Sequence, residues 1–407
     1  MKGKPLLPNL RELIFRWTSP ASTEILHLIS PTLRHLDMSE DCRRVLAAYR
    51  EEWETAFHAL LSAVFSQLTR LETLALGVRK LAMARVSSPL SQLQSLRGIA
   101  LGYNSSVDVE TLRVLSNLPD LRFAVLGKIE CDRSTLVNPP FPGYKQLEEL
   151  VIHDHPLSDQ FYDMFSSPRL TTIDVLQYTP SQFWLFGNTC DVWSRSFPAL
   201  RFVSCNFDQP PRSSEVWQPS THTISQTIKS LFGIKLITQL SLTFAPSQFT
   251  VSDQDISDIA SAWPCLTTLE LGVDPSLYMF MPQDPAQPGT GETALSCLAV
   301  RCPLLQILRL DRLDMRDVHT ETIEECVGRI PTHRRLEHLL FGRVQVDGGD
   351  YGKGARVVDR LFPNLRVPPE WEQIRGVRMF WDAISSCKAE REERAGVSTE
   401  LLTTVRV

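Results

Sequence analysis

The sequence predicts an α/β solenoid, a fold in which short helix–strand units stack one after another. The stretch Thr293–Leu310, TALSCLAVRCPLLQILRL, shows the unit most clearly. Its first half places apolar residues at helical spacing, and Pro303 follows the helical pattern. Its second half reads L-x-x-L-x-L, and the last part alternates as a β-strand does. Because similar segments recur along most of the chain, we interpret the pattern as an internal repeat.

The strand half of the unit occurs thirteen times, and we call its three apolar positions the first, second and third anchors. The first anchors are Leu10, Leu33, Leu71, Leu96, Leu121, Leu147, Leu170, Leu200, Ile237, Leu266, Leu305, Leu336 and Leu365. In eight copies a proline stands two residues earlier, where it ends the preceding helix and favours extended chain. The first anchors lie 23 to 39 residues apart. The shorter spacings fit one strand, one turn and one helix. We therefore expect a curved leucine-rich-repeat horseshoe, with a parallel β-sheet on the concave side and helices on the convex side.

The helices of the convex side are predicted between the strands. They fall at residues 22–29, 108–117, 158–165, 223–232, 253–263, 292–301, 320–329 and 354–362. Many begin at a Ser, Thr or Asp that can cap the first turn. Residues 41–67 form one long helical pattern, which accounts for the wide spacing there. The aromatic stretch at 177–198 is interpreted as an irregular helix that seals the stack.

For the domain organisation, we expect residues 1–367 to form the repeat array, with insertions at 41–67, 177–198, 208–219 and 274–291. The last two insertions are rich in Pro, Gln, Ser and Gly and are predicted loops. The second loop contains an apolar patch, Leu277–Met281, which either binds a partner or folds back on the array. Residues 368–407 are predicted to form a helical cap and a frayed tail, because the end of a repeat array must be covered.

Composition narrows the partners and the compartment. The formal net charge of -5 gives no reason to expect nucleic acid or an anionic membrane as a partner. The nine cysteines form no C-x-x-C pair, and several occupy apolar pattern positions. Free thiols of this kind suit a reducing compartment, so we expect an intracellular protein, cytoplasmic or nuclear. The sequence contains no apolar run that suits a signal peptide or a membrane span.

Two units resemble the cysteine-containing repeat of F-box proteins. Residues 251–271 carry its pattern, with Trp263 in the place of the cysteine, and residues 294–310 carry it with Cys302 and Pro303. The irregular spacing is similar to that of large fungal F-box and leucine-rich-repeat families. The resemblance implies a non-catalytic protein-binding module, and more narrowly the substrate-recognition part of an F-box-type ubiquitin ligase adaptor. Its protein partner would then be a ubiquitination substrate.

The F-box itself has no counterpart in this sequence. Residues 6–13, LLPNLREL, match the repeat better than the start of an F-box. Either the chain is incomplete, or it is a relative without an F-box. A cullin-ligase adaptor is expected as a partner only if an F-box exists outside this chain. The alternative function is a stand-alone leucine-rich-repeat scaffold with no link to ubiquitin ligases.

No arrangement of residues predicts catalysis, a cofactor or a metal site, so we do not expect an enzyme. His153 and His155 share one face if their segment is a strand, but the sequence suggests no third ligand. We interpret His153-Asp154-His155 as a solvated turn. The glycine-rich residues 347–354 lack the spacing of phosphate-binding loops. We interpret them as a flexible loop that caps the next helix.

The concave face is the predicted binding surface, because the residues between the anchors point away from the shared core. Phe123, Phe202 and Arg309 are of the types that dominate protein interfaces. The small, uncharged residues from Thr73 to Ala100 would let a partner backbone approach closely. Alternatively, neighbouring insertions cover these side chains. The candidate partner-binding residues are Phe123, Val125, Glu149, Val151, Phe202, Glu270, Ile307 and Arg309.

Overall fold

The computed structural model describes most of the 407 residues. The described ranges are 5–17, 24–40, 50–77, 83–130, 143–154, 160–165, 167–178, 185–207, 223–244, 251–272, 289–316, 332–366 and 375–404. The predicted helix at 320–329, the loop at 208–219 and the apolar patch at 277–281 lie outside them. The chain divides into two compact units, Met1–Cys205 and Asn206–Val407.

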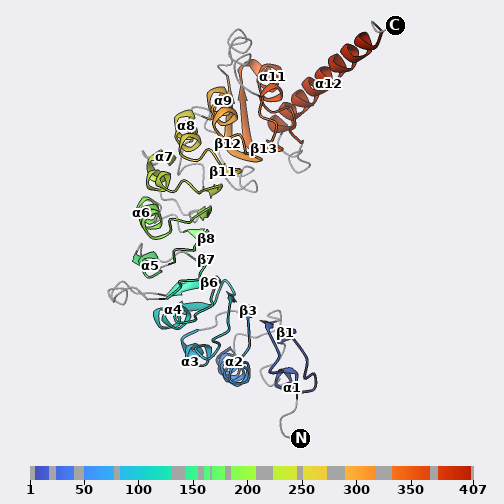
Figure 1. Cartoon of the computed structure of the whole chain (residues 1–407). Coiled ribbons are helices and arrows are strands. Elements are labelled where there is room, and N and C mark those ends of the chain that lie inside the picture. The colour runs from blue at the N-terminus through green and yellow to red at the C-terminus, as the bar shows by residue number, and fades with distance from the viewer. Residues whose placement is uncertain are drawn as a thin grey trace. The chain divides into compact units, whose positions relative to one another are not determined.

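In the first unit, parallel strands lie side by side in chain order, and the helices lie along one face of them (Figure 1). A short strand, β5 (Ser106–Asp108), pairs with β6 away from this row. The row is β1 (Glu12–Trp17), β2 (His35–Glu40), β3 (Thr73–Gly77), β4 (Gly98–Leu101), β6 (Phe123–Glu130), β7 (Glu149–Asp154), β8 (Thr172–Tyr178) and β9 (Phe202–Phe207). The helices are α1 (Ile25–Leu28), α2 (Arg50–Phe65), α3 (Ser87–Leu90), α4 (Val109–Ser116), α5 (Gln160–Asp163) and α6 (Phe186–Ser196), with a 3-10 turn, η3 (Met83–Arg85).

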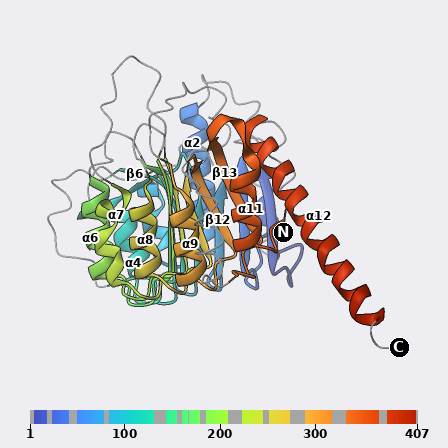
Figure 2. The same ribbon diagram turned by 90° about the horizontal axis from the view of Figure 1, so that it is seen from above.

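The second unit repeats this plan with longer strands at its end. Its strands are β10 (Gln239–Thr243), β11 (Thr268–Gly272), β12 (Ile307–Met315) and β13 (His338–Val346), again parallel and in chain order. Its helices are α7 (Ile224–Thr227), α8 (Asp253–Ala262), α9 (Glu292–Arg301), α11 (Tyr351–Leu361) and α12 (Arg375–Thr404), with 3-10 turns η5 (Lys229–Gly233) and η7 (Asp347–Gly349). Figure 2 shows α8, α9 and α11 following one another along one face.

The anchors form the core of both units, which confirms the predicted leucine-rich-repeat solenoid. In the first unit the second anchors face one another from strand to strand, as Leu36, Leu74 and Ile99 do. In the second unit Leu269, Leu308 and Leu339 do the same. All of these side chains are at most 2% exposed. Each buried leucine contributes about 1.5–3 kcal/mol. No single repeat could bury its own anchors, so the stacking of repeats is what makes the fold stable.

Twelve of the thirteen predicted copies contain a strand. The thirteenth begins at Leu365, which is buried, but the chain after residue 366 lies outside the described part. The strand β5 was not predicted, because three residues are too few to show an alternating pattern. Among the helices, α9 has the predicted bounds, whereas the stretch predicted as one helix at 223–232 is α7 followed by η5. The break falls at Ile228, which is fully buried.

A recurring turn joins helix to strand. Phe197, Trp263, Cys302 and Phe362 each end a helix in the same non-helical conformation, with φ between -116° and -131° and ψ between 66° and 74°. Each is followed by a proline, which disfavours helical backbone at the residue before it. Each is also at most 1% exposed. The residue three positions before the first anchor is therefore a core position, which the leucine pattern did not reveal.

Two of these residues also form hydrogen bonds to the neighbouring repeat. The Trp263 indole N–H donates to the Ile234 carbonyl at 2.9 Å. The Cys302 thiol lies 3.6 Å from the Trp263 carbonyl oxygen, and burial raises the pKa of this thiol to about 12. In the next repeat, His333 occupies the corresponding position, and its Nε2 lies 2.9 Å from the Cys302 carbonyl oxygen. The turns of neighbouring repeats are thus joined directly in this part of the second unit.

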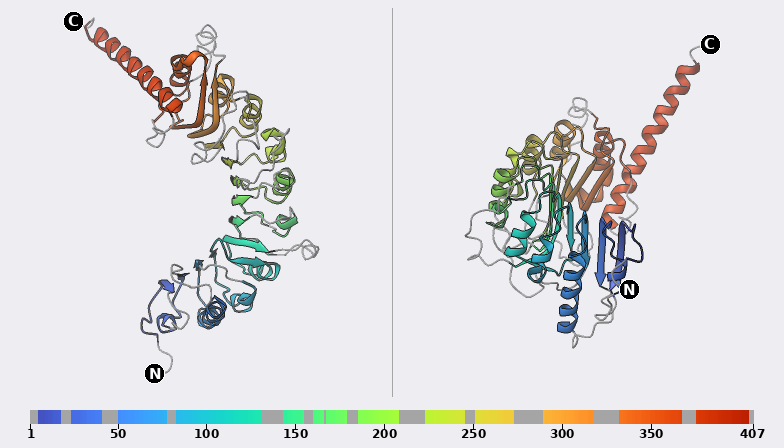
Figure 3. Two further views of the ribbon diagram at one scale, coloured as in Figure 1. Left: turned by 180° about the vertical axis from the view of Figure 1, so that it is seen from behind. Right: turned by 60° about the horizontal axis from the view of Figure 1, so that its bottom comes forward.

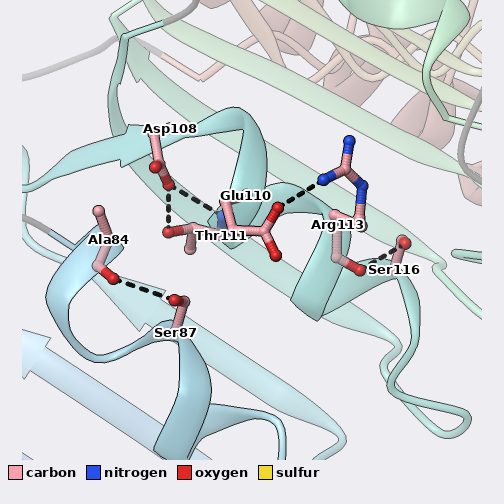
Figure 4. A network of polar contacts seen from close by, with 7 residues as sticks. All are labelled: Ala84, Ser87, Asp108, Glu110, Thr111, Arg113 and Ser116. Atoms are coloured by element: carbon pink, nitrogen blue, oxygen red, sulfur yellow. Dashed lines mark hydrogen bonds and ion pairs between the residues drawn. The ribbon is translucent and has the colours of Figure 1, made fainter. Parts of the chain in front are cut away.

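Side-chain caps fix the starts of some of the helices, among them α4 and α8. Asp108 accepts hydrogen bonds from the Thr111 amide at 2.9 Å and from its hydroxyl, at the start of α4 (Figure 4). Ser252 and Asp255 form a capping box at α8, and Asp255 also accepts from the Ser225 amide at 2.9 Å. Asp255 is 1% exposed, so this one carboxylate serves both α8 and α7. Replacing a helix cap typically costs about 1 kcal/mol.

The helix α12 packs on α11 and β13 through its first half and then runs out beyond them (Figures 1 and 3). Trp381 stacks on Phe341 with ring centroids 5.7 Å apart. Arg391 donates to the carbonyl oxygens of Asp359 and Pro363, both at 3.0 Å. The sequence predicted a helical cap within residues 368–407. A boundary of the repeat array at residue 367, and a capping role for α12, stay predictions.

Exchanging the two neighbours Ile307 and Leu308 for aspartate tests the strand register. Truncating a buried leucine costs about 2–5 kcal/mol. Leu308→Asp should lower stability by at least this much, because it also buries an unpaired charge. Ile307→Asp, one residue away on the outward side, should cost less than about 1 kcal/mol. Thermal melting followed by circular dichroism measures both. Equal melting temperatures would show that the register is wrong.

A buried histidine, His58 in α2, predicts an acid-dependent loss of stability. It is 7% exposed, and neither ring nitrogen has a hydrogen-bond partner among the described residues. Burial, and then the charge of Arg85, lower the pKa of His58 from its ordinary 6.5. Below pH 6.5 the unfolded chain therefore binds a proton that the folded chain does not, and stability falls as pH falls towards the folded-state pKa.

The variant His58→Leu should lose this part of the pH dependence. Chemical unfolding of wild type and variant between pH 7.5 and pH 5.0 gives the two slopes, and their difference isolates His58 from the carboxyl groups. If the two slopes are the same, His58 is not the group that titrates.

Candidate functional site

The face of the strands that the helices do not cover carries two residues from each main strand, one on either side of the second anchor. In the first unit we call this set strand face 1. Most of its members are partly or largely exposed, while the second anchors between them, from Leu36 on β2 onward, are buried. Strand face 1 consists of Glu12, Ile14, His35, Asp37, Thr73, Ala75, Gly98, Ala100, Phe123, Val125, Glu149, Val151, Thr172, Asp174, Phe202 and Ser204.

Strand register brings four predicted site residues together on β6 and β7. Phe123 pairs with Glu149, and Val125 pairs with Val151. Phe202 lies on β9, whose first amide donates to the Thr171 carbonyl at 2.9 Å and so places β9 beside β8. All five side chains are partly exposed. Their role in binding stays a prediction.

The other three predicted residues belong to the second unit. Glu270 on β11 pairs with Arg309 on β12, and Ile307 lies two residues before Arg309 on the same face. The Glu270 carboxylate accepts a hydrogen bond from the Ser241 hydroxyl at 2.7 Å. These residues are also partly exposed. The eight predicted residues therefore form two groups, one in each unit.

A hollow of about 440 Å³ lies over β1, β2, β3, β4 and β6 in strand face 1. Its floor is low because Ala75, Gly98 and Ala100 have short side chains or none. A Cβ atom on Gly98 would lie 3.5 Å from Thr73 Cγ2 and 3.6 Å from Phe123 Cδ1, which is ordinary contact. Ile14, whose side chain is 65% exposed, and Phe123 line the hollow from its two outermost strands, β1 and β6.

The charge of strand face 1 is one-sided. Its sixteen residues include the carboxylates Glu12, Asp37, Glu149 and Asp174, and no Lys or Arg. Burial, and then the neighbouring charge of Asp174, raise the pKa of Glu149. Burial also raises the pKa of Asp174, while a hydrogen bond from Ser204 and the proximity of His153 act in the opposite direction.

The interpretation of His153 and Asp154 as a solvated turn was wrong. Both residues end the strand β7 and are only partly exposed, and Asp154 pairs in register with Lys128 of β6. The strand is longer than the leucine pattern shows, because its pairing with β6 continues past the third anchor. Burial lowers the pKa of His153, although Asp174 opposes the change. Among the described residues, no group of three or more His, Cys, Asp or Glu side chains is placed to hold a metal ion.

Sequence reasoning missed a row of charged residues directly before the strands. Arg34 donates to Glu72 at 2.7 Å, Arg97 lies 3.8 Å from the same carboxylate, and Arg122 lies 3.7 Å from Glu148. Exposed pairs of this kind contribute about 0–1 kcal/mol each. The signal was present in the sequence, since a charged residue follows the first anchor in many copies. The arginines therefore border strand face 1 without standing on it.

No family model matches this chain, and no curated protein sequence matches it. Among the solved structures that are similar to it, three have 14% sequence identity. An internalin from Listeria monocytogenes has a TM-score of 0.46, over 90% of this chain and 88% of that one. A leucine-rich-repeat protein from Leptospira interrogans has 0.40, over 94% and 92%. A chain of the Rad7–Elc1 complex from yeast has 0.42, over 84% and 77%.

None of the helices in the described ranges is both long enough and apolar enough to cross a membrane.

The fold assignment rests on the strand register and on the buried anchors of this chain itself, as Leu150 of β7 illustrates.

Truncating one outward and one inward residue on neighbouring strands tests the exposed character of the candidate site. Phe123→Ala should lower stability by about 1 kcal/mol or less, because the ring is partly exposed and lies on the outward side. Leu150→Ala should cost about 2–5 kcal/mol, because Leu150 is fully buried. Chemical unfolding measures both changes. A loss for Phe123→Ala as large as that for Leu150→Ala would assign Phe123 to the core.

Proposed function

We propose that this chain is a non-catalytic protein-binding module that holds its partner on strand face 1. One observation carries the proposal. Phe123, Val125, Val151 and Phe202 are large apolar side chains that remain partly exposed on the side of the strands opposite the helices. A strand face in permanent contact with water has no need of such residues, whereas exposed apolar clusters edged by polar groups are typical of protein-binding sites.

The resemblance to F-box proteins supports a narrower role, the substrate-recognition part of an F-box-type ubiquitin ligase adaptor. The two units that carry the resemblance contain Trp263-Pro264 and Cys302-Pro303, which form the recurring turn. In this role the partner on strand face 1 is a ubiquitination substrate. A cullin-ligase adaptor would bind through an F-box outside this chain. The buried free thiols of Cys190, Cys205 and Cys302 support an intracellular location, cytoplasmic or nuclear.

Protein capture with matched variants tests both levels of the proposal. The bait is the full chain as wild type, as Phe123→Ala/Phe202→Ala, and as Val300→Ala/Leu236→Ala. The last variant removes apolar side chains that are 51% and 49% exposed and lie outside strand face 1. Proteins cross-linked in an extract of the source cells are then quantified by mass spectrometry.

We expect a set of proteins that wild type and control variant capture equally, and that the strand-face variant captures at least ten-fold less. Cullin-adaptor subunits recovered with all three baits would favour the ubiquitin ligase role over a stand-alone scaffold. A partner set that depends on Val300 and Leu236 instead would place the binding surface elsewhere and contradict the proposal.

A further inference from the structure

We propose that the hollow over β1 to β6 holds one apolar side chain of an extended protein segment, and that a Lys or Arg of the same segment pairs with Glu12 or Asp37. The inference rests on the proposed function, because it names the kind of partner that strand face 1 recognises. Cavity shape and charge, which are independent of each other, both point to it.

The shape of the hollow fits a side chain with its backbone. The short residues pair across β3 and β4, Thr73 with Gly98 and Ala75 with Ala100. Taller residues stand on either side, Asp37 on β2 and Phe123 on β6. Strands lie about 4.8 Å apart, so β2 and β6 are separated by roughly 14 Å. This width admits one extended segment whose Leu, Ile, Met or Phe side chain reaches the low floor.

Apolar contact is available on the walls as well as the floor. The Phe123 ring borders the hollow next to Gly98, and Ile14 lines its other end with a side chain that is 65% exposed. Covering such surface with an aliphatic side chain contributes about 25 cal/mol for each Å² removed from water. An apolar residue in the hollow would therefore supply affinity that a polar residue would not.

The charge around the hollow selects the neighbouring residue of the partner. The lining residues include the carboxylates of Glu12 and Asp37, and no Lys or Arg. His35, which pairs in register with Glu12 on one side and Thr73 on the other, is engaged with the Thr73 hydroxyl at 2.7 Å. In the row before the strands, Arg34 is engaged with Glu72. A cationic side chain beside the apolar one completes the charge balance, and an acidic segment would be repelled.

Selection from a library of random 12-residue peptides tests the inference on the full chain. Enriched peptides are synthesised, and their affinities are measured by fluorescence anisotropy. Gly98→Leu fills the hollow from its floor, and Gly98→Ala adds one methyl group at ordinary contact distance. Thr268→Leu is the matched control, because Thr268 has the same position before the second anchor on β11. Asp37→Asn removes one carboxylate charge.

We expect enriched peptides to contain an apolar residue within two positions of a Lys or Arg. Gly98→Leu should weaken them at least ten-fold, Gly98→Ala and Asp37→Asn about three-fold, and Thr268→Leu not at all. Asp37→Asn should also reduce the salt dependence of binding. Circular dichroism and thermal melting establish that each variant is folded. If Gly98→Leu does not fold, Gly98→Ala and Asp37→Asn carry the test.

Two results would overturn the inference. One is the enrichment of peptides without the apolar and basic pair, or of none. The other is unchanged affinity for Gly98→Leu and Asp37→Asn. If those same peptides lose affinity for Val151→Ala or Phe202→Ala, strand face 1 still binds protein and only the hollow is wrong. If they bind every strand-face variant equally, the proposed function fails with it.

Discussion

One hydrogen bond, repeated along the chain, sets the geometry on which the rest of the structure depends. At the end of a helix, a buried residue accepts a hydrogen bond at its carbonyl from the amide of the first anchor, three residues later. Leu305 donates in this way to Cys302 at 3.0 Å, and Leu266 donates to Trp263 at 3.1 Å. Proline at the second position of the turn favours this conformation. The turn fixes the point where each strand begins, so the insertions between repeats do not shift the anchors.

Backbone hydrogen bonds at the starts of the strands keep neighbouring strands in the same register. At most strands, the residue before the strand and the first strand residue both donate to one carbonyl, that of the residue directly before the preceding strand. Arg34 and His35 donate to Arg11 at 2.8 and 3.0 Å, and Thr267 and Thr268 donate to Thr238 at 2.7 and 3.2 Å. Because the same pair of bonds recurs in both units, outward residues of neighbouring strands stand beside one another. The hollow is a product of this alignment, since it needs the small residues of β3 and β4 in register.

Much of the fold could be predicted because burial leaves a local mark on the sequence. Leu305, Leu308 and Leu310 alternate as a buried strand must, and α9 shows the spacing of a buried helix face. Polar residues with long-range partners leave no such mark. Asp255 reads as a helix-start residue, yet it also bonds to Ser225, which is 30 residues away. Likewise β12 and β13 run to nine residues each, because their pairing extends beyond the leucine pattern.

The candidate site was predictable in part for the same reason. Alternation placed Phe123, Val125 and Val151 on the outward side, and the structure leaves them partly exposed there. The low floor of the hollow was predictable from the small residues between Thr73 and Ala100, but its extent was not, because it depends on side-chain sizes compared across five strands. The row of charged residues before the strands was also missed, because these residues are polar and the repeat pattern was defined by its apolar positions. Charge on strand face 1 emerges only when all eight strands are read at the same two positions.

The recurring turn has a consequence for the chemistry of its cysteine. The Cys302 thiol is fully buried, and its pKa of about 12 means that almost none of it is thiolate at neutral pH. Thiolate is the nucleophilic form that attacks peroxides and disulfides. Burial also raises the pKa of Cys190 and Cys205. Sulfur at these positions therefore serves as a space-filling atom, and oxidative stress that modifies exposed thiols leaves the helix-to-strand turn intact.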